Sequence, residues 1–158
     1  MLSRKWGFIG IGAALVGAVA AALLYGAGRS SDAAFISPAN RALVARGKVI
    51  YANHCAACHG AALQGQPNWR ERLANGRLPA PPHDKTGHTW HHPDAVLIDI
   101  VTNGLVPGRT APAGYASDMP AFGGTLSREE IVAVLTYIKS SWPPEILRLQ
   151  KEVTLEHL

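Results

Sequence analysis

The stretch Cys55-Ala56-Ala57-Cys58-His59 limits most strongly what this chain can fold into. Cys-x-x-Cys-His is the attachment signature for c-type haem. On a turn of helix, residues three apart lie on the same face, so both thiols can add to the vinyl groups of one porphyrin. His59 follows directly and can bind the iron through an imidazole nitrogen. The sequence therefore predicts one covalent haem c, held by Cys55 and Cys58, with His59 as an axial ligand.

Two other common uses of a Cys-x-x-Cys pair each lack a requirement in this chain. A dithiol redox pair belongs in a βαβ context, and no alternating strand pattern surrounds these cysteines. A structural zinc site needs four ligands, and the whole sequence has only two cysteines. Haem attachment is therefore the interpretation that the motif favours.

Met119 is the candidate for the second axial position. The sequence has two methionines, and the other one is the initiator Met1. A thioether opposite a histidine raises the reduction potential of a haem. Pro120 stiffens the backbone after the sulfur, and Gly123 and Gly124 allow a tight turn. The alternative is a methionine that fills a gap in the core, which is the commoner role of this residue type.

These motifs together resemble the class I mono-haem cytochromes c. The segments that carry the resemblance are Cys55 to His59, Met119-Pro120-Ala121-Phe122, and Leu126 to Ile131 leading into Tyr137-Ile138. The resemblance covers about residues 38 to 142. It implies an all-α fold, a small helical bundle around one covalent haem, in which an N-terminal helix crosses the last helix. The contact that it implies at this crossing is Gly47 against Tyr137.

Caps and turn residues predict the first and last of these helices independently. Ser37 followed by Pro38 indicates an N-cap with proline at the first helical position. Ser127 with Glu130 forms a capping box, and apolar residues recur at helical spacing until Pro143-Pro144. The apolar residues concerned are Leu43, Val44, Val49 and Ile50 in the first helix and Ile131, Val134, Leu135 and Ile138 in the last.

Two further helices and a loop complete the expected domain. His92-Pro93-Asp94 opens a helix that Gly104 ends, with an apolar face formed by Val96, Leu97, Ile100 and Val101. The stretch from Leu105 to Asp118 is rich in glycine and proline and predicts a loop leading to Met119. Residues 145 to 157 predict a short amphipathic helix.

The uncharged run from Gly7 to Gly28 predicts a transmembrane anchor. As a helix rising about 1.5 Å per residue it reaches roughly 33 Å, enough for a hydrocarbon core of about 30 Å. Arg4 and Lys5 precede it, which keeps the N-terminus cytoplasmic and places everything after Arg29 in the periplasm. We therefore expect a single-pass protein of the bacterial inner membrane. Ala-rich triplets in the run leave open a signal peptide that is cleaved.

Small residues recur at every fourth position in this run, which permits close packing against a transmembrane partner helix. The alternative is that an Ala/Gly-rich segment gives this spacing by composition alone. The small residues concerned are Gly10, Ala14, Ala18, Ala22 and Gly26. The expected organisation is an anchor with its cytoplasmic flank over 1–28, a linker over 29–37, the haem domain over 38–142 and a helical extension over 143–158.

The charge distribution favours redox protein partners and no nucleic acid. Much of the formal net charge of +4 comes from residues that flank the anchor. Between residues 41 and 77 the basic residues outnumber the single acidic residue Glu71, whereas the chain from Asp118 onward is net acidic. Such an asymmetry can steer an acidic redox partner. The basic residues are not interleaved with aromatics as a stacking platform for bases requires.

The segment from Gln64 to Pro93 is suited to one wall of a haem crevice. An indole N–H or a guanidinium there can neutralise a propionate, and a carbonyl near Pro67 is a candidate to orient His59 through its second ring nitrogen. The candidates for the wall are Pro67, Trp69, Arg70, Arg72, Pro79, Pro81, Pro82 and Trp90.

Two classes of function follow. The first is a membrane-tethered periplasmic electron carrier that passes single electrons between respiratory or dehydrogenase partners, alone or as the cytochrome subunit of a redox enzyme complex. It has no catalytic residues of its own. The second is a haem-bearing enzyme subunit or sensor, with an openable sixth ligand position or a second metal bound by the cluster His83, His88, His91 and His92.

Overall fold

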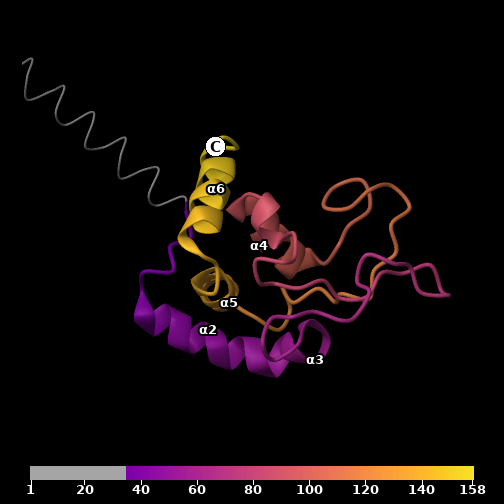
Figure 1. The fold of residues 1–158 in the computed structure, drawn as a ribbon, viewed down its shortest axis with the longest axis horizontal. Coiled ribbons are helices and arrows are strands. Elements are labelled where there is room, and N and C mark those ends of the chain that lie inside the picture. The colour runs from indigo at the N-terminus through magenta and orange to yellow at the C-terminus, as the bar shows by residue number, and fades with distance from the viewer. Residues whose placement is uncertain (1–34) are drawn as a thin grey trace, which may run out of the picture. The chain divides into compact units, whose positions relative to one another are not determined.

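The computed structural model describes residues 35–158, and its regular structure is helical (Figure 1). The elements in chain order are α2 (Arg41–His54), α3 (Ala56–His59), η1 (Thr89–His91), α4 (Asp94–Asn103), α5 (Arg128–Ser140) and α6 (Pro144–Leu155). Within the described residues the only β pairing is an isolated bridge between Pro107 and Ala111. The predicted all-α fold is confirmed.

The predicted anchor over Gly7 to Gly28 lies outside the described residues. From residue 35 to the C-terminus, none of the helices combines the length and the apolar character that crossing a bilayer requires.

Helix α2 begins three residues later than the sequence predicted. Asn40 is its N-cap, and the Asn40 Oδ1 accepts hydrogen bonds from the backbone N–H groups of Ala42 at 3.1 Å and Leu43 at 3.2 Å. Ser37 instead caps a separate turn, where its hydroxyl accepts from the Ala39 N–H at 3.3 Å. Serine and asparagine are comparable N-caps, and the position nearer the uninterrupted helix forms the cap here.

The predicted crossing of the first and last core helices is confirmed. In Figure 1, α5 is seen nearly end-on beside α2, and these two helices share the most extensive contact of the described domain. A Cβ atom added to Gly47 would fall on the Ala133 carbonyl and lie 2.9 Å from the Tyr137 Cβ. Glycine is therefore required for the two backbones to approach this closely. The Arg46 guanidinium also reaches the Glu130 carboxylate at 3.3 Å, where α5 begins.

Helices α4, α5 and α6 also agree with the predictions in type and nearly in extent, whereas the short 3-10 helix η1 was not predicted. The capping box of Ser127 and Glu130 is formed at the start of α5. Gly104 ends α4 with a φ of 74°, a left-handed conformation that favours glycine. The two prolines that separate the last helices act at the start of α6, with Pro143 as its N-cap and Pro144 in its first turn.

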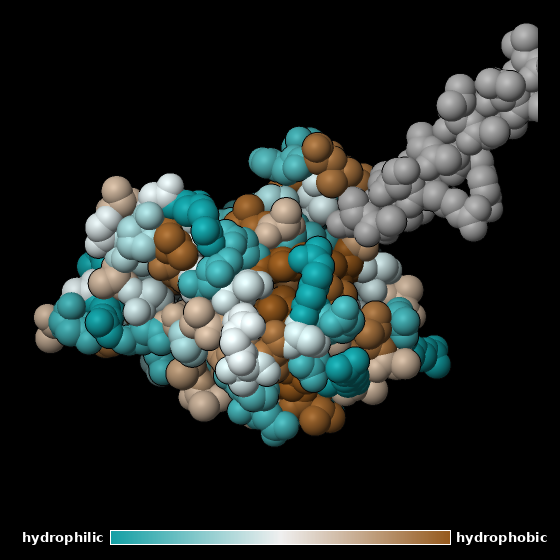
Figure 2. All heavy atoms as spheres, turned by 180° about the vertical axis from the view of Figure 1, so that it is seen from behind, coloured by the Kyte–Doolittle hydropathy of each residue, from teal (hydrophilic) through white to brown (hydrophobic). Residues whose placement is uncertain are grey.

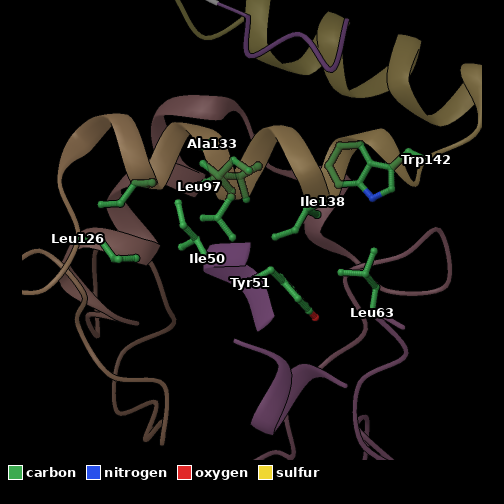
Figure 3. Close-up of a cluster of buried hydrophobic side chains, with 11 residues drawn as sticks. Ile50, Tyr51, Leu63, Leu97, Leu126, Ala133, Ile138 and Trp142 are labelled. Carbon is green, nitrogen blue, oxygen red and sulfur yellow. The ribbon is translucent and has the colours of Figure 1, made fainter. Parts of the chain in front are cut away.

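The hydrophobic core lies between α2, α4 and α5 (Figure 3). Ile50 and Tyr51 enter it from α2, Leu97 from α4, and Ala133 and Ile138 from α5. The outer surface seen in Figure 2 is mostly polar or mixed, with apolar residues gathered in a narrow band. The long connections over 60–88 and 105–127 leave the helices on one side and lie next to each other (Figure 1).

A buried ion pair joins α4, α5 and α6. The Lys139 Nζ lies 2.5 Å from the Asp94 Oδ1, and the two side chains are 0% and 2% exposed. Gln150 on α6 completes the group, because its Oε1 accepts from Lys139 at 2.7 Å and its Nε2 donates to Asp94 at 2.8 Å. Burial lowers the pKa of Lys139 to about 8, and the Asp94 carboxylate opposes that shift.

The same carboxylate fixes the chain where it enters the domain. The Ile36 N–H donates to the Asp94 Oδ2 at 2.6 Å, and the Lys139 ammonium lies 4.0 Å from the centre of the Phe35 ring. Thr154 on α6 accepts from the Asp94 N–H at 3.2 Å, at the start of α4. Each charged atom of the pair is thus surrounded by partners, as a buried charge requires.

Replacing Lys139 by Met should destabilise the holoprotein by about 3–5 kcal/mol, because it leaves the Asp94 carboxylate buried without its cation. Unfolding in urea, followed by far-ultraviolet circular dichroism, measures the change. The matched control is Arg148→Ala, which breaks an exposed pair with Glu152 at 2.7 Å and should cost under about 1 kcal/mol. Equal effects of the two variants would contradict a special role for the buried pair.

Candidate haem-binding site

The structure brings Cys55, Cys58 and His59 together on a single turn. Cys55 ends α2 and caps α3. The Cys55 carbonyl accepts from the N–H groups of Cys58 at 3.2 Å and His59 at 2.9 Å. Neither cysteine is part of a disulfide, and Cys55 is partly buried whereas Cys58 is exposed. Two thiols and an imidazole are thus presented by one short helix.

The electrostatics of Cys55 differ from those of a reactive dithiol. Burial raises the pKa of the Cys55 thiol to about 11, and the neighbouring Cys58 adds to the shift. Attacking cysteines of Cys-x-x-Cys redox pairs have a lowered pKa, because the thiolate is the nucleophile. This environment therefore argues against the dithiol redox alternative.

His59 is held in one tautomer by a backbone carbonyl. Its ring is buried, with 8% exposure, and its Nδ1 lies 2.8 Å from the Pro81 oxygen. A carbonyl can only accept, so the proton is on Nδ1 and the Nε2 lone pair is available to a metal. Burial lowers the pKa of His59, although the bond to Pro81 opposes it. A neutral imidazole oriented through its second nitrogen is what metal ligation requires.

Pro81 reaches His59 because two backbone segments pair. The Gln66 N–H donates to the Ala80 carbonyl at 2.9 Å, and the His83 N–H donates to the Leu63 carbonyl at 2.8 Å. The chain after the motif is also folded back on it, since the Gly65 N–H donates to the His59 carbonyl at 2.8 Å. The expectation of a carbonyl near Pro67 is wrong, because this pairing brings Pro81 to the imidazole.

Two glycines make room for that arrangement. A Cβ atom on Gly65 would collide with the backbone of Pro81 and Pro82, and one on Gly87 with the Pro82 carbonyl. Gly65 also has a φ of 68°. These glycines are the sequence signal that could have pointed to the Pro81-Pro82 segment, because a bare backbone is needed where two chains pass this closely.

Met119 lies on a separate segment that is fixed to the end of α4. The last carbonyls of that helix, at Val101 and Thr102, accept from the N–H groups of Phe122 at 3.0 Å and Gly123 at 2.9 Å. Carbonyls at a helix C-terminus have no partner within the helix, so this pairing satisfies them. The Met119 N–H is bound by the Ser117 hydroxyl at 3.0 Å. Met119 itself is half-buried.

A ring contact connects the Met119 segment to the cysteine motif. Phe122 meets His54 edge to face, with 6.2 Å between the ring centres. His54 directly precedes Cys55, so the turn after Met119 lies beside the start of the motif.

The predicted crevice wall contacts the loop before Met119. Arg77 pairs with Asp118, and the Arg72 guanidinium lies 5.9 Å from the centre of the Tyr115 ring. Among the other predicted wall residues, Trp90 has a buried indole N–H with no hydrogen-bond partner in the part of the chain that the structure describes. A free buried donor of this kind fits a bound anionic group.

The four clustered histidines are divided between two places. His83 lies against His59, whereas His88 lies between Trp69 and His92, with 5.6 Å separating the ring centres on either side. Across residues 35–158, no three His, Cys, Asp or Glu side chains form a group that could hold a metal ion. The alternative of a second metal bound by this cluster therefore finds no ligand group among the described residues.

The donor set fits haem c. Two thiols and a neutral imidazole with a free Nε2 share one turn, and a half-buried thioether lies on a segment that touches the residue before that turn. The domain also matches the family model for cytochrome c over residues 44–142. The chain belongs to the cytochrome c family. It is an electron-transfer haem protein with one covalently bound haem c, as the sequence predicted.

Two curated relatives are subunits of larger redox enzymes. The cbb3-type cytochrome c oxidase subunit CcoP of Azospirillum sp. (strain B510) is 33% identical over 97 residues, which are 60% of this chain and 27% of that subunit. The gluconate 2-dehydrogenase cytochrome c subunit of Pantoea cypripedii is 31% identical over 96 residues, 61% of this chain and 20% of that subunit. The match thus spans about a quarter or less of each relative. No solved structure matches the chain.

Covalent attachment through both thiols has a direct chemical test. Acid acetone should leave the colour on the wild-type polypeptide, because thioether bonds survive the loss of iron ligation. Cys58→Ala should retain one vinyl group, and its pyridine haemochrome band should move to longer wavelength because conjugation is extended. Extraction of free haem from the wild-type protein would contradict attachment at Cys55 and Cys58.

Proposed function

We propose that this cytochrome is a membrane-tethered carrier of single electrons whose haem iron is ligated by His59 and Met119. The observation that carries the proposal is the hydrogen bond from His59 Nδ1 to the Pro81 oxygen at 2.8 Å. That bond leaves one nitrogen free, in a buried and neutral ring, beside two thiols suited to thioether formation. When bound, haem c supplies a one-electron couple between ferric and ferrous iron.

Two hydrogen bonds near His59 adjust it as a ligand and fix the turn that carries it. The Pro81 carbonyl increases the basicity of the imidazole by accepting a hydrogen bond from its Nδ1–H group. The Tyr51 hydroxyl donates a hydrogen bond to the Gly60 carbonyl at 3.1 Å, which ties the residue after His59 to α2. A ligand fixed in this way needs little rearrangement when the charge of the metal changes.

Met119 is proposed as the second ligand because the segment that carries it is fixed near the cysteine motif by contacts that do not involve His59. The attachment of Phe122 and Gly123 to α4 and the contact of Phe122 with His54 hold the segment near the motif. A thioether is a neutral, soft ligand that favours the reduced iron and raises the potential. Filling both axial positions favours electron transfer over the binding of small molecules.

The tether and the partners rest on sequence and on the relatives. The uncharged run from Gly7 to Gly28, with Arg4 and Lys5 before it, supports an inner-membrane anchor that leaves the haem domain in the periplasm. The two relatives are named as subunits of an oxidase and a dehydrogenase. We infer that membrane and periplasmic redox proteins are the donor and the acceptor of this carrier.

Replacing Met119 by Ala should open the sixth iron position. The ferric wild-type protein should show the weak near-infrared band of sulfur-to-iron ligation, and the variant should lack it and bind added imidazole or cyanide readily. Ser117→Ala is the matched control, because it removes only the hydroxyl that binds the Met119 N–H. A wild-type protein that lacks the band, or a variant that keeps it, would contradict the Met119 assignment and favour the sensor or enzyme alternative.

The full-length protein should stay in the membrane fraction after washing with salt or alkaline carbonate, because burial of the Gly7 to Gly28 run is hydrophobic rather than electrostatic. A chain that starts near Ser30 behind a cleavable signal should be released and keep its haem. Mature wild-type chains that begin after about residue 20 in the soluble fraction would identify the run as a signal peptide. The proposed carrier function would survive that result.

A further inference from the structure

We propose that His83 is a positioning residue, whose ring fixes the orientation of the His59 imidazole and keeps water from its face. The inference rests on the proposed role of His59 as an axial ligand. It assigns a function to one member of the histidine cluster.

The two imidazoles are stacked. Their ring centres are 3.8 Å apart, with an angle of 17° between the planes. His59 is therefore constrained in two perpendicular directions, at its edge by the Pro81 carbonyl and on its face by the His83 ring. The hydrogen bond alone fixes where Nδ1 points, and the stack limits rotation of the ring about that direction.

His83 is itself held from three sides. The Trp142 indole donates to the His83 carbonyl at 2.8 Å, and the His83 N–H donates to the Leu63 carbonyl at 2.8 Å. The Tyr51 ring meets the His83 ring edge to face, with 5.8 Å between centres. Trp142 and Tyr51 belong to the buried core, so His83 is attached to that core.

The hydrogen bonding of the His83 side chain points to packing as its role. Its buried Nδ1 has no hydrogen-bond partner in the described domain. An unsatisfied buried nitrogen reduces stability, so a hydrogen bond of Nδ1 is not what holds the ring at this place. The ring instead packs on the face of His59 and against the Tyr51 ring.

The stacking of His83 on His59 affects the reduction potential through the hydrogen bond between the His59 Nδ1 and the Pro81 carbonyl. The Pro81 carbonyl makes His59 a stronger donor, which favours ferric iron. Without the His83 ring, water can reach His59, compete for its Nδ1 proton and allow the imidazole to turn. The ferrous form should then be favoured, and the potential should rise.

The test compares His83→Ala with His83→Phe and Trp142→Phe in the holoprotein. His83→Ala should change the ferrous-to-ferric ratio at a fixed ambient potential by about tenfold, an upward shift of about 59 mV for one electron. The haem-methyl resonances of the ferric protein, which report the orientation of the axial imidazole, should shift with it. His83→Phe keeps a ring on His59 and should lie closer to wild type. The exposed His91, changed to Ala, is the matched control and should leave both measurements unchanged.

The outcomes separate this inference from the proposed ligation. If the wild-type spectra show His and Met ligation but His83→Ala alters neither the potential nor the resonances, the positioning role is wrong. A shift in His83→Phe as large as that in His83→Ala would also overturn it. If His83→Ala fails to assemble with haem, Trp142→Phe decides, since loosening His83 should give a smaller shift in the same direction and wild-type values would contradict the role. A wild-type iron without histidine ligation would overturn both proposals.

Discussion

The pairing of residues 63–66 with residues 80–84 determines where the His59 imidazole points. The cysteine motif alone delivers a histidine on a short helix, but such a ring can still turn. The hydrogen bonds at Gln66 and His83 place the Pro81 carbonyl at Nδ1 and, through the same short segment, the His83 ring on the imidazole face. One local pairing of backbones therefore supplies both constraints on the candidate ligand.

Features that depend on neighbouring residues could be predicted from the sequence. The capping box at Ser127, the glycine that ends α4 at Gly104 and the cysteine motif are all local, and each was recognised from residues a few positions apart. The contact of Gly47 with Tyr137 came from resemblance to a family. The start of α2 was misplaced because Ser37 and Asn40 are both good N-caps, and only the later fold decides between them.

Features that depend on distant pairings could not be predicted. Nothing local distinguishes the carbonyl of Pro81 from that of Pro67, since the choice is made by the return of the chain against residues 63–66. Lys139 gives a similar lesson. A lysine in the last turn of an amphipathic helix normally reaches water, and its burial follows from Asp94 and Gln150 on two other helices. The sequence contains these partners without any spacing that links them.

Helix α4 carries contacts at both of its ends, and this makes it a mechanical connection. At its first residue, Asp94 holds the Ile36 amide, where the chain enters the domain. At its other end, Val101 and Thr102 hold the turn that follows Met119. A displacement of the chain at Ile36 therefore acts on a helix of 10 residues, about 15 Å long, whose other end binds the turn after the candidate thioether ligand. The buried Lys139 ties the first residue of α4 to α5 as well, so one helix joins the chain entry both to the core and to the turn that follows Met119.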